Sequence, residues 1–278
     1  MNEDSTQTGK VFLIGAGPGD PKLLTIKAAE ALAASDVIVY DYLVNPEVLI
    51  HARRGVELIY AGKRAGEKSL SQTAINQLLI ERARQGQVVT RLKGGDPFIF
   101  GRGGEEAEAL VEAGVEWEVV PGISSGVAAA AYAGIPLTHR GYSSSVAFIT
   151  GHDGRNGNRQ PVDWSVAARA ADTLVIFMCA ESISRISREL IANGRARSTP
   201  VAIIRWGTYQ DQEVYSGVLE DLIALDDLSE FGFKFESPAI AIIGDVVSLA
   251  EKLRWFGLDE LRYSLRDPAN FEAVAVND

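Results

Sequence analysis

Short apolar runs alternate with helical stretches along this chain, which predicts an α/β fold with two α/β domains. Strands of this kind, each followed by a helix, are typical of a parallel sheet that is covered on both faces. The run 134–141 is rich in turn-forming residues and interrupts the alternation, which predicts the domain boundary. The expected parts are a disordered lead (1–9), an N-terminal domain (10–138), a C-terminal domain (139–258) and a polar tail (259–278).

The first domain shows the alternation most clearly and is expected to hold a mainly parallel sheet. Asp20 and Pro21 supply an N-cap and a first-turn proline for a helix over Leu23–Ala34. Residues 71–85 carry apolar side chains at helical spacing, which predicts an amphipathic helix. The other expected elements are strands over Val11–Ile14, Val37–Tyr40, Val88–Leu92 and Trp117–Val120 and helices over Glu105–Ala113 and Val127–Ala133.

The second domain repeats the pattern with one difference. A short strand over Val214–Val218 is added, and it favours a mixed sheet. Cys179 follows an apolar run, so a buried core thiol is its expected role. A polar, glycine-rich loop is expected over 152–160. The main strands are expected over Val146–Thr150, Leu174–Met178, Val201–Trp206 and Ala239–Ile243.

Composition limits the classes of function. A net charge of −10 argues against a general nucleic-acid binder, which needs a basic surface. The single cysteine cannot form an internal disulfide, and the polar start of the chain does not resemble a secretory signal, so a cytoplasmic protein is expected. No apolar run approaches the roughly 18 residues of a membrane span. Three histidines and one cysteine, without a metal-binding spacing, predict no metal site.

The run 91–106 is the most informative segment. An apolar strand ends in this run and is followed by Gly94 and Gly95. A second glycine cluster then encloses Arg102 beside the acid pair 105–106. Glycine lets the backbone pass very close to a ligand. The run therefore predicts a small-molecule site at the carboxyl end of a parallel strand. A glycine-rich turn before a solvated helix is the structural alternative.

Two other motifs resemble known sites and fail in detail. Residues 15–20 suggest a dinucleotide-binding turn, but Asp20 stands where that motif needs glycine and Pro18 lacks a backbone N–H for pyrophosphate. Residues 122–126 match the nucleophile elbow of a hydrolase. No acid lies between Ser124 and His152, the last histidine, so the triad order of such enzymes is impossible. Ser124 and Ser125 either offer hydroxyl and N–H groups to a ligand or cap a helix.

Charged groups follow the ends of several expected strands. If these strands are parallel, most of the cations share one rim and predict a polyanionic small ligand, although scattered surface charges would give the same pattern. Asp41 is a candidate general base or ligand-orienting carboxylate, with helix capping as the alternative. The cations are Lys63, Arg64, Arg91, Lys93, Arg102 and Arg140.

On these motifs the chain resembles the tetrapyrrole (corrin/porphyrin) methyltransferase family from about residue 10 to 256. The long segments 11–21, 91–106 and 131–140 carry most of the resemblance. Shorter segments that match are 23–25, 40–44, 62–64, 120–124, 150–152, 199–202, 207–208 and 237–239.

The resemblance implies a tetrapyrrole methylase-like fold, with an active-site trough between the two domains, in a homodimer. It implies S-adenosylmethionine as methyl donor, S-adenosylhomocysteine as product, no metal, and uroporphyrinogen III as the substrate that is methylated at C2 and C7 to precorrin-2. Asp41, Lys63 and Arg102 match catalytic positions, and Arg102, Glu105, Arg140 and Met178 match substrate-binding positions. The implied cofactor-binding positions are Pro18, Gly94, Gly95, Asp96, Ile99, Ser124, Ser125, Met178, Gly207 and Ala239.

Three positions depart from the pattern of the family. Ser124 replaces a threonine but keeps the hydroxyl, Lys68 replaces a common histidine, and Cys179 replaces a glycine after Met178, which predicts a less close approach of the backbone to the cofactor. The alternatives to uroporphyrinogen methylation are a later precorrin methyltransferase, a nicotinamide oxidoreductase and a tetrapyrrole carrier without catalysis. The intact run 91–106 favours uroporphyrinogen methylation over a later precorrin methyltransferase. Pro18 and Asp20 argue against the oxidoreductase. Asp41, Lys63 and Arg102 argue against the carrier.

Overall fold

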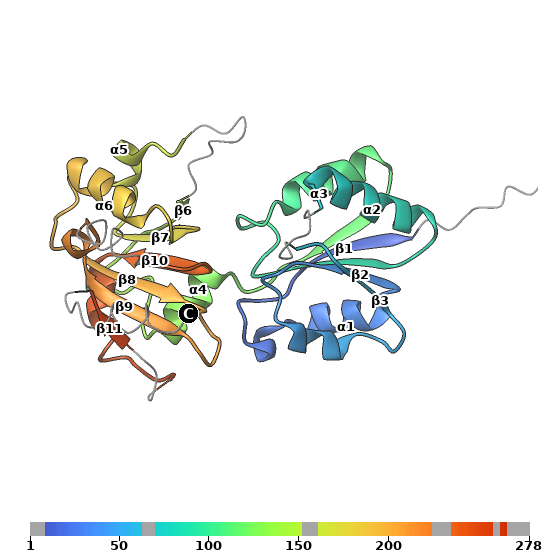
Figure 1. Ribbon diagram of the computed structural model, residues 1–278, viewed down its shortest axis with the longest axis horizontal. Coiled ribbons are helices and arrows are strands. Elements are labelled where there is room, and N and C mark those ends of the chain that lie inside the picture. Colours follow the sequence, from blue (N-terminus) through green and yellow to red (C-terminus); the bar gives the residue numbers. More distant parts are fainter. Residues whose placement is uncertain (1–8, 63–69, 152–160, 224–234, 258–261, 266–278) are drawn as a thin grey trace, which may run out of the picture. The chain divides into compact units, whose positions relative to one another are not determined.

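The chain folds as two compact units, Met1–Ser125 and Gly126–Asp278. The computed structural model describes residues 9–62, 70–151, 161–223, 235–257 and 262–265 (Figure 1). The division between the units falls after the first residue of helix α4 (Ser125–Tyr132), whereas the sequence places the boundary after residue 138. The reason is that α4 packs its alanines into the core of the second unit.

The first unit is built on a parallel five-stranded sheet in the order β3-β2-β4-β1-β5. Each adjacent pair of strands is parallel, so the carboxyl ends of all five strands meet at one edge. We call this edge the first carboxyl edge. The strands are β1 (Lys10–Gly15), β2 (Val37–Tyr40), β3 (Glu57–Tyr60), β4 (Val89–Lys93) and β5 (Glu116–Val120).

Helices cover both faces of this sheet. Helices α2 (Gln72–Arg84) and α3 (Gly103–Glu112) lie on one face, and α1 (Ile26–Ala34) lies on the other (Figure 1). Two separate hydrophobic clusters fill the two interfaces, as expected for a sheet that is buried on both sides. The short 3-10 helix η2 (Pro46–His51) adds Val48 to the cluster under α1.

The first helix begins later than the sequence predicts. Asp20 and Pro21 cap and open the short 3-10 helix η1 (Pro21–Leu23) instead of α1. Residues 24 and 25 then return to extended backbone, and Thr25 caps α1 by accepting a hydrogen bond from the Ala28 N–H. Gly9, expected in the lead, is buried, and its N–H donates to the Ala83 carbonyl at 2.8 Å; the remainder of the lead lies outside the described residues.

The second unit is built on a mixed six-stranded sheet in the order β11-β9-β8-β10-β7-β6. Strand β10 is antiparallel to both of its neighbours, β7 and β8, while β6 and β7 are parallel. Strand β11 (Arg262–Ser264) pairs with β9, so part of the expected polar tail is a strand. The other strands are β6 (Val146–Thr150), β7 (Thr173–Phe177), β8 (Pro200–Arg205), β9 (Glu213–Val218) and β10 (Ala239–Ile243).

The side chains of β7 show how this sheet is buried on both sides. Leu174 and Ile176 point into the cluster that also contains α5 (Trp164–Ala167) and α6 (Ile183–Ala192). Val175 and Phe177 point into the opposite cluster, with α4 and the 3-10 helix η3 (Asp245–Leu249). This alternation is the two-residue period of a strand. Among the described residues, no helix has both the length and the apolar character that a membrane crossing requires.

Candidate functional site

The loops that follow β1, β4 and β5 meet at the first carboxyl edge. Gly95 and Gly17 exchange backbone hydrogen bonds, with the Gly95 N–H donating to the Gly17 carbonyl at 2.7 Å and the Gly17 N–H donating to Gly95 at 3.2 Å. All seven implied cofactor-binding positions of the first unit therefore lie on neighbouring loops or at their ends. These are Pro18, Gly94, Gly95, Asp96, Ile99, Ser124 and Ser125.

A different constraint favours glycine at each of these turns. A Cβ on Gly122 would lie 2.2 Å from the Gly95 carbonyl oxygen, so this glycine serves protein packing. A Cβ on Gly94 would lie 2.8 Å from the Leu43 Cβ, so its close approach is to Leu43. Gly95 differs, because its φ is +68° and a Cβ there would lie 3.6 Å from its nearest neighbour, the Ser125 nitrogen. Only Gly95 keeps an open side toward the start of α4, where a ligand could lie against the backbone.

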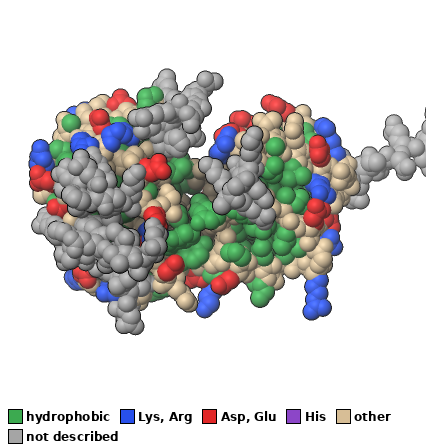
Figure 2. Space-filling view, viewed as in Figure 1, with side chains coloured by type: hydrophobic (Ala, Val, Ile, Leu, Met, Phe, Trp, Pro, Cys, Tyr) green, Lys and Arg blue, Asp and Glu red, His purple; other side chains and the backbone are tan. Residues whose placement is uncertain are grey.

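Asp96 ties two of the loops together. One carboxylate oxygen accepts from the Phe98 N–H at 2.8 Å, and the other accepts from the Gly122 N–H at 3.0 Å. The side chain thus fixes the turn after β4 against the turn after β5. Ile99, Phe98 and Phe100 remain partly exposed on this loop, and the visible face of the first unit shows a broad hydrophobic area (Figure 2).

Behind this edge lies a cluster of four charged side chains, of which Arg91, Lys93 and Glu106 are buried and Asp41 is partly exposed. Arg91 on β4 is almost fully buried, and its Nη2 donates to both oxygens of Asp41 at 2.7 and 2.8 Å. Its Nε donates to Oε1 of Glu106 at 3.0 Å, and its Nη1 donates to the Val39 carbonyl at 3.3 Å. Lys93, two residues along the same strand, donates to the same Glu106 oxygen at 3.0 Å.

The cluster changes the interpretation of two predicted rim cations. Burial lowers the pKa of the Lys93 ammonium below its ordinary value, and the neighbouring charge of Arg91 lowers it further. Burial would also lower the pKa of Arg91, but the charges of Asp41 and Glu106 outweigh that effect and raise it. Arg91 and Lys93 are therefore paired inside the protein, and the prediction that they help to form a free basic rim is wrong.

Arg102 lies outside this cluster, at the N-cap of α3. Its backbone is left-handed, with φ of 59°, which its glycine neighbours accommodate in a tight turn. Its side chain is half exposed and forms a bidentate pair with Glu105, with Nε–Oε1 at 2.9 Å and Nη2–Oε2 at 2.7 Å. The two acids of the pair 105–106 thus differ: Glu105 is exposed beside Arg102, while Glu106 points inward.

In the second unit, three implied cofactor-binding positions lie at one edge of the sheet. The antiparallel pairing brings the end of β7, the end of β8 and the start of β10 together, so Met178, Gly207 and Ala239 are neighbours at this edge. Met178, Trp206 and Thr208 all adopt positive φ without being glycine. Such strained backbone gathers at ligand sites in many proteins. A Cβ on Gly207 would lie 2.3 Å from the Ala129 Cβ, so Gly207 also permits close packing on α4.

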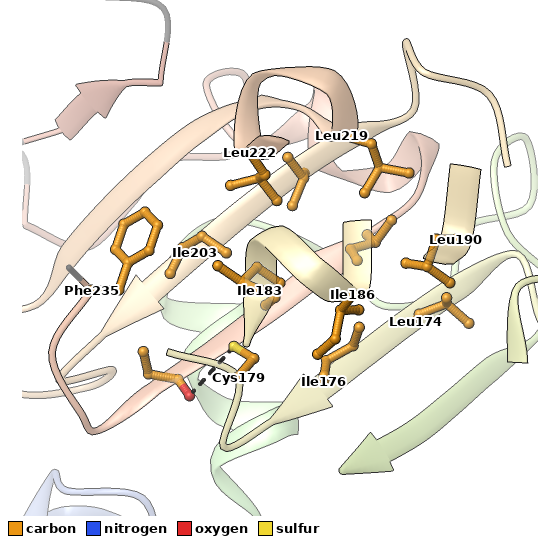
Figure 3. Packing of buried hydrophobic residues seen from close by; sticks show 14 of the residues in the cluster. Leu174, Ile176, Cys179, Ile183, Ile186, Leu190, Ile203, Leu219, Leu222 and Phe235 are labelled. Carbon is orange, nitrogen blue, oxygen red and sulfur yellow. Dashed lines mark hydrogen bonds between the residues drawn. The ribbon is translucent and has the colours of Figure 1, made fainter. Parts of the chain in front are cut away.

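Cys179 is a buried core thiol, as predicted. It is fully buried among α6 and its sheet, and its Sγ lies 3.9 Å from the Ala239 carbonyl oxygen (Figure 3). Burial raises the pKa of this thiol to about 12. The side chain points into the core and does not extend from the edge where Met178 is exposed.

Several predicted residues lie outside the described part of the chain, and one important residue was not predicted. Lys63, Arg64, Lys68 and the loop 152–160 lie outside the described residues, and Arg140 is exposed in a turn of the second unit. Glu106 was not singled out, although a signal existed: it shares the inner face of α3 with Ala107 and Leu110. A carboxylate on an apolar helix face indicates a buried charge with a partner.

Comparison with known proteins gives a consistent result. The model of the tetrapyrrole (corrin/porphyrin) methylases matches residues 10–223. Uroporphyrinogen-III C-methyltransferase of Priestia megaterium is 47% identical over 242 residues, which cover 87% of this chain and 100% of that protein. Siroheme synthase of Blochmanniella pennsylvanica is 49% identical over 265 residues, which cover 95% of this chain and 54% of that protein. The chain thus spans about half the length of the siroheme synthases that it matches.

A solved structure shares the fold. The crystal structure of uroporphyrin-III C-methyl transferase from Thermus thermophilus, complexed with S-adenyl homocysteine, is 37% identical and superposes with a TM-score of 0.71. The match covers 86% of this chain and 93% of that one.

The buried thiol gives a direct test of the second unit. At about pH 8, iodoacetamide should leave Cys179 unmodified in the folded protein, because only the thiolate reacts and burial suppresses it. The same protein in denaturant, as control, should gain one carbamidomethyl group by mass spectrometry. Equal labelling rates in the two samples would show that Cys179 is not buried.

Proposed function

The chain belongs to the tetrapyrrole (corrin/porphyrin) methylase family, and we propose that it methylates uroporphyrinogen III at C2 and C7, with S-adenosylmethionine as donor, to give precorrin-2. The observation that carries the proposal is the first carboxyl edge. There the run 91–106 places the open side of Gly95 beside Ser124 and Ser125. The carboxylate of Asp41 is held next to the same strand.

The residues present fit a cofactor that lies against the backbone. Gly95 has a left-handed φ and unfilled space where a Cβ would stand, and α4 begins on the far side of that space. When bound, S-adenosylmethionine supplies an electrophilic methyl group on a sulfonium, which an electron-rich ring carbon can attack directly. The protein's task is then to align the two reactants, which is a large source of rate enhancement.

Asp41 is suited to accept the proton that the methylated ring must lose. Arg91 occupies one acceptor position on each of its oxygens, and an ionised carboxylate has about four such positions in total. The side chain keeps about 29% of its surface exposed, so part of it remains accessible. The role of Lys63, the other acid–base candidate, is proposed from the family resemblance.

Arg102 is suited to bind the substrate, which carries eight carboxylates, while Glu105 is assigned to the substrate by the family resemblance. Their mutual ion pair is half exposed, and such pairs contribute only about 0–1 kcal/mol. A substrate carboxylate can therefore replace Glu105 at little cost and gain a bidentate partner in Arg102. Arg140 and Met178 are assigned to the substrate by the family resemblance. A homodimer rests on the same resemblance, and analytical ultracentrifugation can check it. A cytoplasmic location rests on the single cysteine, and cell fractionation can check it.

The proposed reaction predicts its own stoichiometry. Incubation with S-adenosylmethionine and enzymatically prepared uroporphyrinogen III should add two methyl groups to each tetrapyrrole, through a singly methylated intermediate. Mass spectrometry of the products follows both steps, and a reaction without the methyl donor is the control. No gain in mass, or activity only on an already methylated precorrin, would falsify this assignment.

Substitution of Gly95 tests the cofactor site against a matched glycine. Gly95 and Gly114 share a φ of +68°, and a Cβ on Gly114 would meet nothing within 4 Å. Gly95→Ala and Gly114→Ala should therefore lose similar stability, about 1–2 kcal/mol each. Only Gly95→Ala should weaken the binding of S-adenosylhomocysteine, by about tenfold or more, which corresponds to about 1.4 kcal/mol. Equal affinity of both variants in calorimetry would remove Gly95 from the cofactor site.

Substitution of Arg102 tests the substrate side. A hydrogen bond to a charged group contributes about 1.5–3 kcal/mol, so Arg102→Ala should lower kcat/KM by about 10- to 150-fold. Arg102→Lys should recover only part, because an ammonium lacks the planar fork. S-adenosylhomocysteine affinity should stay at the parental value, and Arg54→Ala, which removes an exposed arginine, is the control. Parental turnover by Arg102→Ala would leave the arginine with a structural role only.

A further inference from the structure

Glu106 is a buried carboxylate that the proposed chemistry does not use. Its side chain has no exposed surface. Oε1 accepts hydrogen bonds from Arg91 Nε at 3.0 Å, Lys93 Nζ at 3.0 Å and Gln72 Nε2 at 3.1 Å. Oε2 has no hydrogen-bond partner among the described residues. A buried charge is costly unless it is paired, so a carboxylate held by three donors from two further elements needs a reason.

The reason follows from the shape of the guanidinium that Glu106 contacts. Arg91 presents its donors in a rigid planar fork. Glu106 holds Nε and the Val39 carbonyl holds Nη1, so the direction of Nη2 is fixed. Nη2 in turn donates to both oxygens of Asp41. The carboxylate of Asp41 therefore cannot shift or rotate freely while Arg91 is held by Glu106.

Lys93 balances the charge of this arrangement. Asp41 and Glu106 carry two negative charges, and Arg91 and Lys93 carry two positive charges, so the cluster is neutral as a whole. Removing the charge of Glu106 would leave Arg91 and Lys93 with only Asp41 to share. Both cations would then compete for Asp41, whose Oδ2 already lies 3.8 Å from Lys93.

We infer that Glu106 is a positioning residue, which acts through Arg91 to fix the carboxylate of Asp41 at the first carboxyl edge. The inference rests on the proposed function, in which Asp41 accepts the ring proton. Glu106 itself reaches no substrate, because it is covered on the inner face of α3. A purely structural ion pair would affect the whole unit, whereas a positioning residue affects catalysis only while Asp41 is present.

A double-mutant cycle separates these two roles. Glu106→Gln keeps the shape and removes the charge. It should lower kcat by about 10- to 100-fold, because a misplacement of about 1 Å can cost about 100-fold. KM for both substrates should stay within about threefold. In an Asp41→Asn background the same change should cause no further loss, because its effect passes through the missing carboxylate.

Two variants calibrate the cycle. Glu106→Asp keeps the charge on a shorter side chain and should recover part of the lost kcat. Glu108→Gln removes an exposed acid from the same helix and should keep the parental kcat. If Glu106→Gln fails to fold, Glu106→Asp takes its place in the cycle. Parental kcat in the Glu106 variant, or an equal loss with and without Asp41, overturns the inference.

Crystal structures of the parent and of Glu106→Gln provide a result that does not depend on activity. We expect the variant to lose at least one of the two hydrogen bonds between Arg91 Nη2 and Asp41. A variant that keeps both bonds overturns the inference. If these bonds are lost but the parent does not methylate uroporphyrinogen III, the proposed function fails while the positioning contact stands.

Discussion

The loops after β1, β4 and β5 approach so closely that no side chain fits between them, and the geometry of the first unit depends on this contact. Gly15, Gly95 and Gly122 meet backbone to backbone, since a Cβ on Gly15 would lie 2.5 Å from the Gly95 carbonyl oxygen. Asp96 locks the same turns through its two hydrogen bonds. The contact brings segments about 80 and 107 residues after Gly15 to one point, and it leaves one side of Gly95 open, where the proposed cofactor would lie.

The charged cluster beneath this contact shows how an acidic protein can hold cations away from solvent. Arg91 and Lys93 lie on consecutive inward positions of β4 and are paired on both sides, by Asp41 after β2 and by Glu106 on α3. Removing one partner of such a buried pair costs about 3–5 kcal/mol, because the other charge is left without compensation. The arrangement is therefore sensitive to the loss of any one member, and Asp41 is held in it by the two hydrogen bonds from Arg91.

In the second unit, backbone strain marks the edge of the sheet at which the implied cofactor-binding residues lie. Met178, Trp206 and Thr208 keep positive φ, which costs of order 1–3 kcal/mol per residue unless the surroundings impose it. The surroundings are visible here: Gly207 packs directly on Ala129 of α4, and the Thr208 N–H donates to the buried Gln212 side chain at 2.9 Å. Cys179, on the core side of Met178, fills space in the hydrophobic cluster and leaves the exposed edge to Met178.

The sequence alone determined the order of the elements, because the period of the apolar residues and the turn residues between them are local signals. It determined that β1, β4 and β5 end in glycine turns, and its long motifs determined the family. It misplaced the start of α1, because Asp20 and Thr25 are both competent caps and only packing selects between them. Tertiary structure alone decided that Arg91 and Lys93 are buried, that Glu106 faces them from α3, and that α4 joins the second core. The physical reason is that a charge's partner, unlike a turn or a helix period, depends on residues far away along the chain.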